Sequence, residues 1–270
     1  MTFKIGFNAE TKQPQNSASV CTAEQVHAAR KSVVQVHFAA RNMTLAYYND
    51  RFDLQCGDWV YVDGKLEGLL GQVVKVTYHF KIRLSDYKRV IFAVDTRVRG
   101  KFFMAGTHFV AFDRAALPYA KAAAWFIPPK TEGEEFVSGD DDEGFPLCDL
   151  SKMEIGAEVF ERGRNYYLEN RVQYLCLDGT HGRAVVEGRE GYEVEFEYRN
   201  GQIENLVCSC FCSCHCKHEL AVMLQLRETL EKIEKEYAEE YQKSGYFAAI
   251  GKGTFFSFAV NGKEKGSFVL

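Results

Sequence analysis

A chain of 270 residues, 46% apolar and 26% charged, has the composition of a globular protein, which excludes disorder throughout. Its formal charge of -4 does not favour nucleic-acid binding through bulk charge, so any phosphate-binding surface has to be local. No run approaches the roughly 20 apolar residues of a membrane span. The opening sequence MTFKIGFNAETK also lacks the apolar core of a secretory signal. We therefore expect a cytoplasmic protein with no membrane partner.

The nine cysteines are a second constraint. Thiols stay reduced in the cytoplasm, so this number favours metal or redox chemistry over a disulfide framework. Four of the cysteines are scattered and are expected to be small buried hydrophobes: Cys21, Cys56, Cys148 and Cys176. The other five lie between positions 208 and 216.

The N-terminal half is predicted to be rich in β-strands. We expect residues 1–21 to form a loosely held arm and residues 22–129 to form a domain. Its β-type runs, separated by Gly, Asn and Asp, are VVQVHF (33–38), TLAYY (44–48), DWVYV (58–62) and GQVVKV (71–76). The stretch GDWVYVDGKLEGLLGQVVKV resembles small β-barrel modules of translation and primosomal proteins. The resemblance implies a small antiparallel β-barrel-like domain.

A basic surface is predicted from the next run, KVTYHFKIRL (75–84), where apolar residues alternate with Lys75, Thr77, His79, Lys81 and Arg83. The period of two predicts a strand with one basic face. Residues 75–101 contain eight Lys or Arg and two Asp, a local charge of +6. This face either protects a sheet edge or contacts phosphates. The nucleic-acid-binding candidates are Lys75, Lys81, Arg83, Arg97, Arg99, Lys101 and, further along the chain, Lys217.

An acidic segment without periodicity, KTEGEEFVSGDDDEGFP (130–146), reads as a solvated linker over 130–149. The second domain then extends over 150–270. It begins with successive strands, among them a hairpin whose turn is Asn200-Gly201. From residue 216 the apolar period changes to three or four, which predicts a helix over about 216–242. The two domains together predict an α+β protein.

The strongest motif is VCSCFCSCHCKHEL (207–220). Four ligands in a tetrahedron suit Zn²⁺. A curled hairpin end can supply Cys208 and Cys210, and the start of a helix can supply Cys216 and His218. A shifted quartet that uses Cys212, Cys214 or His215, and an iron–sulfur or multinuclear thiolate cluster, are the alternatives.

This pattern, C-x-C followed by C-x-H and an apolar helix, resembles the SWIM zinc finger. The preceding FERGRNYYLENRV and VVEGREGYEVEF also look like that family, so the resemblance covers about residues 155–227. It implies a small zinc-binding module that contacts DNA or proteins, found alongside transposases, helicase-like remodelling ATPases and ubiquitin-related factors. The chain departs from the family in its loop, where Cys212, Cys214 and His215 add competing ligands.

The chain contains no phosphate-binding glycine loop and no G-x-S-x-G or H-E-x-x-H motif, so we expect no enzyme and no small-molecule substrate. The first hypothesis is a DNA- or RNA-associated accessory protein ordered by zinc. The second is a protein–protein interaction adaptor that docks through the helix 216–242 or through the C-terminal YFAAIGKGTFFSFAV. The third is a thiol redox or metal sensor that uses Cys212 and Cys214.

Overall fold

The computed structural model describes residues 29–129, 144–210, 212 and 214–260. The predicted arm (1–21) lies outside these residues, as does most of the predicted linker. The chain divides into two compact units between Val94 and Asp95. We call residues 29–94 the N-terminal unit and the described residues from 95 onward the C-terminal unit. None of the described helices is long and apolar enough to cross a membrane.

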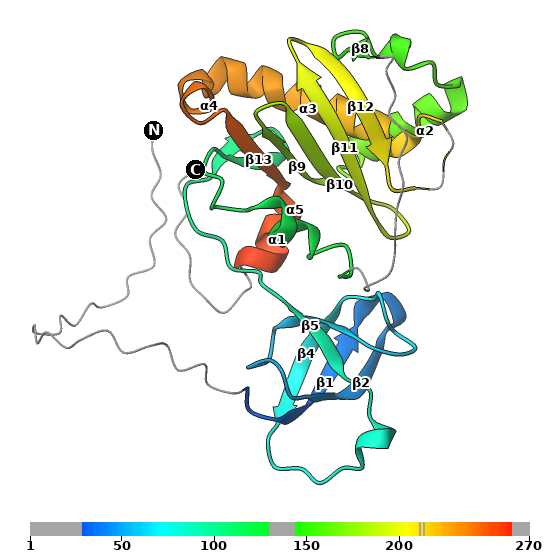
Figure 1. The fold of residues 1–270 in the computed structure, drawn as a ribbon, viewed down its shortest axis with the longest axis vertical. Helices are drawn as coiled ribbons and strands as arrows, with labels where there is room; N and C mark the ends of the chain where they lie inside the picture. The colour runs from blue at the N-terminus through cyan, green and yellow to red at the C-terminus, as the bar shows by residue number, and fades with distance from the viewer. Residues whose placement is uncertain (1–28, 130–143, 211, 213, 261–270) are drawn as a thin grey trace, which may run out of the picture. The chain divides into compact units, whose positions relative to one another are not determined.

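The N-terminal unit is a five-stranded antiparallel sheet in the order β2-β1-β4-β3-β5. The strands are β1 (Ser32–Phe38), β2 (Met43–Asn49), β3 (Trp59–Val62), β4 (Gly71–Thr77) and β5 (Val90–Val94), with short 3-10 turns at Ala39–Arg41 and Leu84–Asp86. Alternate side chains of β1 point into a small core, among them Val34, Val36 and Phe38. The predicted strands of this region are therefore present (Figure 1).

The sheet does not form the expected barrel. Within the described residues, its edge strands β2 and β5 meet only at an isolated bridge between Tyr48 of β2 and Arg89, the residue before β5 begins. A closed barrel needs a continuous ladder between its first and last strands. The unit is therefore an open, curled sheet.

The predicted strand over 75–84 is also shorter than expected. β4 ends at Thr77, and residues 78–83 form a loop. The neighbouring strand β1 pairs with β4 only as far as Val33 opposite Thr77, so the alternating pattern beyond Thr77 has no ladder to join.

The C-terminal unit is built on an eight-stranded antiparallel sheet in the order β6-β7-β13-β9-β10-β11-β12-β8 (Figure 1). The strands are β6 (Phe103–Ala105), β7 (His108–Ala111), β8 (Phe145–Pro146), β9 (Val172–Asp178), β10 (His181–Glu187), β11 (Gly191–Arg199), β12 (Gln202–Cys208) and β13 (Tyr246–Gly251). The helices are α1 (Tyr119–Ala123), α2 (Ala157–Leu168), α3 (Lys217–Glu236), α4 (Ala238–Ser244) and α5 (Lys252–Phe255), with a 3-10 turn at Leu150–Met153 and a π turn at Phe256–Val260.

The long helix α3 covers one face of this sheet. Its apolar stripe, which includes Leu220, Met223 and Leu226, packs in one core with Leu175 of β9 and Val194 of β11. Helix α2 packs in turn on α3. The core therefore holds α3 firmly against the strands that precede it in the chain.

The two units divide between Val94 and Asp95, whereas the sequence predicted a domain boundary in the acidic segment 130–149. Residues 103–111 form the strands β6 and β7, and β7 pairs with β13 through Ala111 opposite Ala248. On the other side of the segment, β8 pairs with β12. This pairing joins β7 to the rest of the sheet through a strand about 140 residues later, which local sequence patterns do not reveal.

The predicted helix over 216–242 is broken at Tyr237, whose φ of -139° and ψ of 26° are not helical. The Tyr237 ring packs on Phe103 and Phe112, and its hydroxyl donates a hydrogen bond of 2.8 Å to the carbonyl of Met104. These contacts with the edge of the sheet replace the continuing helix.

A glycine sets the distance between α2 and α3. A Cβ at Gly163 would lie 2.8 Å from Leu220 Cδ2 and 2.9 Å from the Lys217 carbonyl oxygen. We expect Gly163→Ala to lower the free energy of unfolding by about 1–3 kcal/mol, because the helices have to separate. Urea denaturation measures this change. Gly156→Ala, where a Cβ would meet nothing within 4 Å, is the matched control, and equal midpoints for the two variants would contradict the packing argument.

Candidate metal centre

The first half of the site lies at the end of a β-hairpin. Asn200 and Gly201 both have positive φ, 50° and 84°, as a tight two-residue hairpin turn requires. The returning strand β12 ends at Cys208, which lies opposite Val194 of β11. The chain curls after this residue, and the Cys210 backbone N–H donates to the Cys208 sulfur over 3.5 Å. The predicted hairpin therefore delivers two thiols to one place.

The second half is the start of α3. Cys216 is the N-cap, and its sulfur accepts a hydrogen bond from the backbone of Glu219. The Glu219 carboxylate in turn accepts one from the Cys216 backbone N–H over 2.8 Å. This is a capping box with Cys in the place of Ser or Thr. It fixes the first turn of α3, from which His218 projects.

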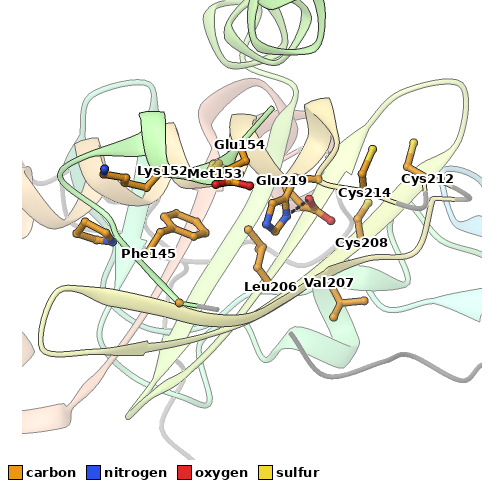
Figure 2. Close-up of a pocket in the computed structure, with 13 residues that line it drawn as sticks. Phe145, Lys152, Met153, Glu154, Leu206, Val207, Cys208, Cys212, Cys214 and Glu219 are labelled. Carbon is orange, nitrogen blue, oxygen red and sulfur yellow. Dashed lines mark hydrogen bonds and ion pairs between the residues drawn. The ribbon is translucent and has the colours of Figure 1, made fainter. Parts of the chain in front are cut away.

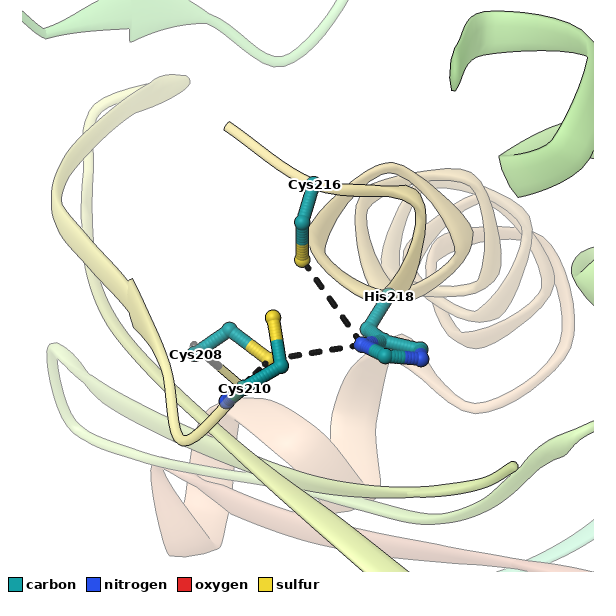
Figure 3. Close-up of side chains that lie close together, drawn as sticks. All are labelled: Cys208, Cys210, Cys216 and His218. Carbon is teal, nitrogen blue, oxygen red and sulfur yellow. Dashed lines mark hydrogen bonds between the residues drawn. The ribbon is translucent and has the colours of Figure 1, made fainter. Parts of the chain in front are cut away.

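The four predicted ligands converge. The ligand atoms of Cys208, Cys210, Cys216 and His218 all lie within 4.8 Å of one another. Figure 3 shows the two hairpin thiols facing the Cys216 sulfur and the His218 ring. The His218 Nδ1 atom lies 3.6 Å from the Cys208 sulfur and 3.8 Å from the Cys216 sulfur. Within the described residues, no other set of three or more His, Cys, Asp and Glu side chains converges in this way.

These separations fit a tetrahedral metal site. Zinc–sulfur bonds of about 2.3 Å and zinc–nitrogen bonds of about 2.0–2.1 Å place tetrahedral N and S ligands about 3.6 Å apart. The cluster is therefore close to the geometry of a bound ion. It could hold a metal ion with three sulfur ligands and one nitrogen ligand.

The protonation of the thiols also suits a cation. The Cys208 thiol donates a hydrogen bond to Cys216, which lowers the pKa of Cys216 and raises that of Cys208. Burial raises the pKa of Cys210. The three sulfurs repel one another when more than one of them is ionised, and a divalent cation at their centre would remove that repulsion.

Aromatic rings hold the histidine in place. The Tyr192 ring stacks on His218 with centroids 4.2 Å apart, and Tyr166 lies against it at 5.4 Å. The His218 Nε2 atom is buried and has no hydrogen-bond partner among the described residues. With Nδ1 directed at the sulfurs, stacking therefore replaces the second hydrogen bond that orients many metal-bound histidines.

The loop between the two halves contains the surplus ligands. Cys212 and Cys214 are exposed and line a pocket of about 690 Å³ (Figure 2). His215 is not in the convergent group, and its Nδ1 atom makes a 3.0 Å contact with the buried carboxylate of Glu219. The described geometry therefore favours the first quartet over the shifted ones.

Glu219 is the site residue that the sequence reasoning missed. It lies three residues after the N-cap, where a capping box places Glu or Gln, and this spacing was the available signal. Burial raises its pKa, and the His215 imidazole opposes that shift. Its contacts with Cys216 and His215 tie the first turn of α3 to the loop that precedes it.

The loop cysteines supply a direct test of the quartet. We expect a Cys212→Ser/Cys214→Ser double variant to retain the metal content and thermal stability of the parent chain, because neither thiol belongs to the convergent group. Elemental analysis and a melting curve measure both quantities. Loss of the metal from this variant would show that a loop thiol is a ligand.

The scattered cysteines only partly match their expected burial. Cys176 is buried as expected, but Cys56 and Cys148 are exposed, and Cys21 lies outside the described residues. The Cys56 thiol donates to the Val74 carbonyl over 3.5 Å at the surface. A general tendency of cysteine to be buried does not hold at these loop positions.

The nucleic-acid candidates are divided between the two units. Lys75, Lys81 and Arg83 are exposed on the N-terminal unit. Arg97, Arg99 and Lys101 are exposed at the start of the C-terminal unit, where Arg97 forms a 2.8 Å ion pair with Asp95. Lys217 is half-buried, with its ammonium 5.3 Å from the centre of the Tyr166 ring. Three of the seven candidates therefore belong to the N-terminal unit and four to the C-terminal unit.

Comparison with known proteins leaves the site to be interpreted on its own geometry. No family model matches the chain, and no curated protein or solved structure is significantly similar to it.

Proposed function

We propose that the Cys208, Cys210, Cys216 and His218 cluster binds one structural Zn²⁺ ion, in the manner of a SWIM zinc finger. The observation that carries this proposal is the convergence of three thiols and one imidazole nitrogen at separations suited to tetrahedral zinc. Three sulfurs and one nitrogen also favour zinc over hard cations such as Mg²⁺ or Ca²⁺.

Four protein ligands complete a tetrahedron and leave no position for a substrate or an activated water, so the role is structural. The ion would join the end of β12 to the first turn of α3. We therefore propose a non-enzymatic zinc-binding protein whose C-terminal unit is ordered by zinc.

The partner that we propose is nucleic acid, DNA or RNA, with the protein acting as an accessory factor. The SWIM resemblance and the local charge of +6 over residues 75–101 support this role. The exposed Lys75, Lys81 and Arg83 supply cations on the N-terminal unit.

An adaptor role is less well supported by the described surfaces. The first six residues of the segment predicted for docking (246–260), Tyr246–Gly251, form an interior strand of the sheet between β7 and β9 and are all buried, whereas Phe256 further along is exposed. The helix α3 likewise turns its apolar stripe into the core.

Fluorescence anisotropy tests the proposed partner. The zinc-loaded full chain is titrated into labelled single-stranded DNA, duplex DNA and RNA at 50 and 200 mM salt. We expect binding at low salt that weakens by about tenfold or more at the higher concentration. Absence of binding to all three at low salt would overturn nucleic acid as the partner, while the zinc proposal would still be tested by metal content.

A further inference from the structure

An exposed aromatic residue stands at the end of β4 in the N-terminal unit. Tyr78 directly follows the strand and its side chain is 37% exposed. Its hydroxyl donates a hydrogen bond of 3.5 Å to the Leu54 carbonyl, and the Arg30 guanidinium lies 4.1 Å from the ring centre. The ring is therefore held at the surface, with the Arg30 guanidinium over one of its faces, and does not enter the core.

The charged residues that flank Tyr78 in the sequence are mostly basic. Between residues 75 and 88 the sequence has four Lys or Arg and one histidine against a single acidic residue, Asp86. All five of the basic residues are exposed: Lys75, His79, Lys81, Arg83 and Lys88. The carboxylate of Asp86 already accepts a hydrogen bond from the Ser85 hydroxyl over 3.1 Å. The loop therefore presents a positive surface on which Tyr78 is the one aromatic residue classed as exposed.

The loop is anchored so that this arrangement persists without a strand ladder. The Phe80 ring packs edge-on against Tyr48 with centroids 6.2 Å apart. Tyr48 is in turn held beside Arg89, which forms a 2.6 Å ion pair with Asp50. Phe80 and Ile82 are half-buried, whereas the residues between and after them, Lys81 and Arg83, are exposed. The alternation that looked like a strand thus orients cations outward from an anchored loop.

We propose that this loop binds single-stranded nucleic acid, with an unpaired base stacked on Tyr78 and neighbouring phosphates on Lys75, Lys81 and Arg83. This inference rests on the proposed function and names its partner more closely. A purely basic surface would suit the phosphates of a duplex equally well. An exposed ring among cations favours unpaired bases, because the bases of a duplex are stacked on one another and are not free to stack on Tyr78.

The test uses the zinc-loaded full chain and labelled oligonucleotides of about twenty nucleotides, single-stranded or duplex. Tyr78→Ala should weaken single-strand binding about tenfold, and Tyr78→Phe should keep it, because the ring supplies the stacking surface. Lys81→Glu/Arg83→Glu should weaken it further and reduce the slope of log K against log salt by about 1.4, since each phosphate contact contributes about 0.7 for a single strand. The matched control, Lys65→Glu/Lys235→Glu, makes the same charge change at exposed sites outside the loop and should bind like the parent.

Three results would overturn the inference while nucleic-acid binding itself stands: equal affinity for duplex and single strand, an unchanged affinity in Tyr78→Ala, or equal losses in the loop and control variants. Absence of binding to every oligonucleotide at low salt would instead overturn the proposed function. Circular dichroism of each variant shows whether a loss of binding reflects a loss of fold.

Discussion

Cys216→Ala and His218→Ala are each expected to lose the bound zinc and to unfold the C-terminal unit around it. Both side chains are almost fully buried and belong to the convergent group. Zinc binding by small structural sites contributes about 10–16 kcal/mol to folding. Whole domains are stable by only about 5–15 kcal/mol, so loss of the site exceeds what the unit can tolerate.

Metal content measured by mass spectrometry and near-ultraviolet circular dichroism show the two effects together. Cys148→Ala is the matched control, because it removes an exposed thiol of the same unit that is not in the group. It should keep one zinc per chain and the parent spectrum. Stoichiometric zinc in both ligand variants would show that the quartet is assigned wrongly.

Removal of the metal from the parent chain is expected to have the second largest effect, and it should be confined to one unit. Chelation at neutral pH would leave three buried or half-buried thiols crowded within 4.8 Å, with no cation to compensate their charge. The link between β12 and α3 would then be lost. The N-terminal unit has its own core of Val34, Val36, Val60 and neighbouring residues, which contains no metal ligand.

Hydrogen exchange followed by mass spectrometry resolves this difference. We expect faster exchange throughout the C-terminal unit after chelation, including β11, β12 and the first turns of α3, unchanged exchange in β1 to β5, and recovery when Zn²⁺ is added back. Acidification should also speed exchange in the C-terminal unit, because protons compete with zinc for the thiolates and the imidazole. Zinc should therefore be retained at neutral pH and lost as the pH falls. If chelation left the exchange rates of the backbone amides in the C-terminal unit unchanged, a structural role for the metal would be contradicted.

The parts of the site that local sequence could predict are those governed by short-range chemistry. The Asn200-Gly201 turn depends on two residues that tolerate positive φ, and the observed angles match. The change of period near residue 216 marks a helix that does begin at Lys217. Together these two signals place Cys208 and Cys210 opposite Cys216 and His218 without knowledge of the rest of the fold.

The features that sequence reasoning missed depend on distant partners. The strand β7 is paired with β13, and nothing within residues 108–111 identifies that partner. The end of β4 is set by where β1 begins to pair, although the alternating pattern continues through Arg83. The break at Tyr237 follows from its contacts with Phe103 and Phe112. In each case a tertiary contact overrides a periodic local pattern.

Zinc K-edge X-ray absorption on the purified full chain, together with its metal content, tests the central claim most directly. The proposed site predicts one zinc per chain, with three sulfur neighbours at about 2.3 Å and one nitrogen at about 2.0 Å, and with the outer-shell scattering of an imidazole. A shell of four sulfurs, more than one metal ion per chain, or a shell dominated by oxygen would contradict the assignment of Cys208, Cys210, Cys216 and His218 as the ligands.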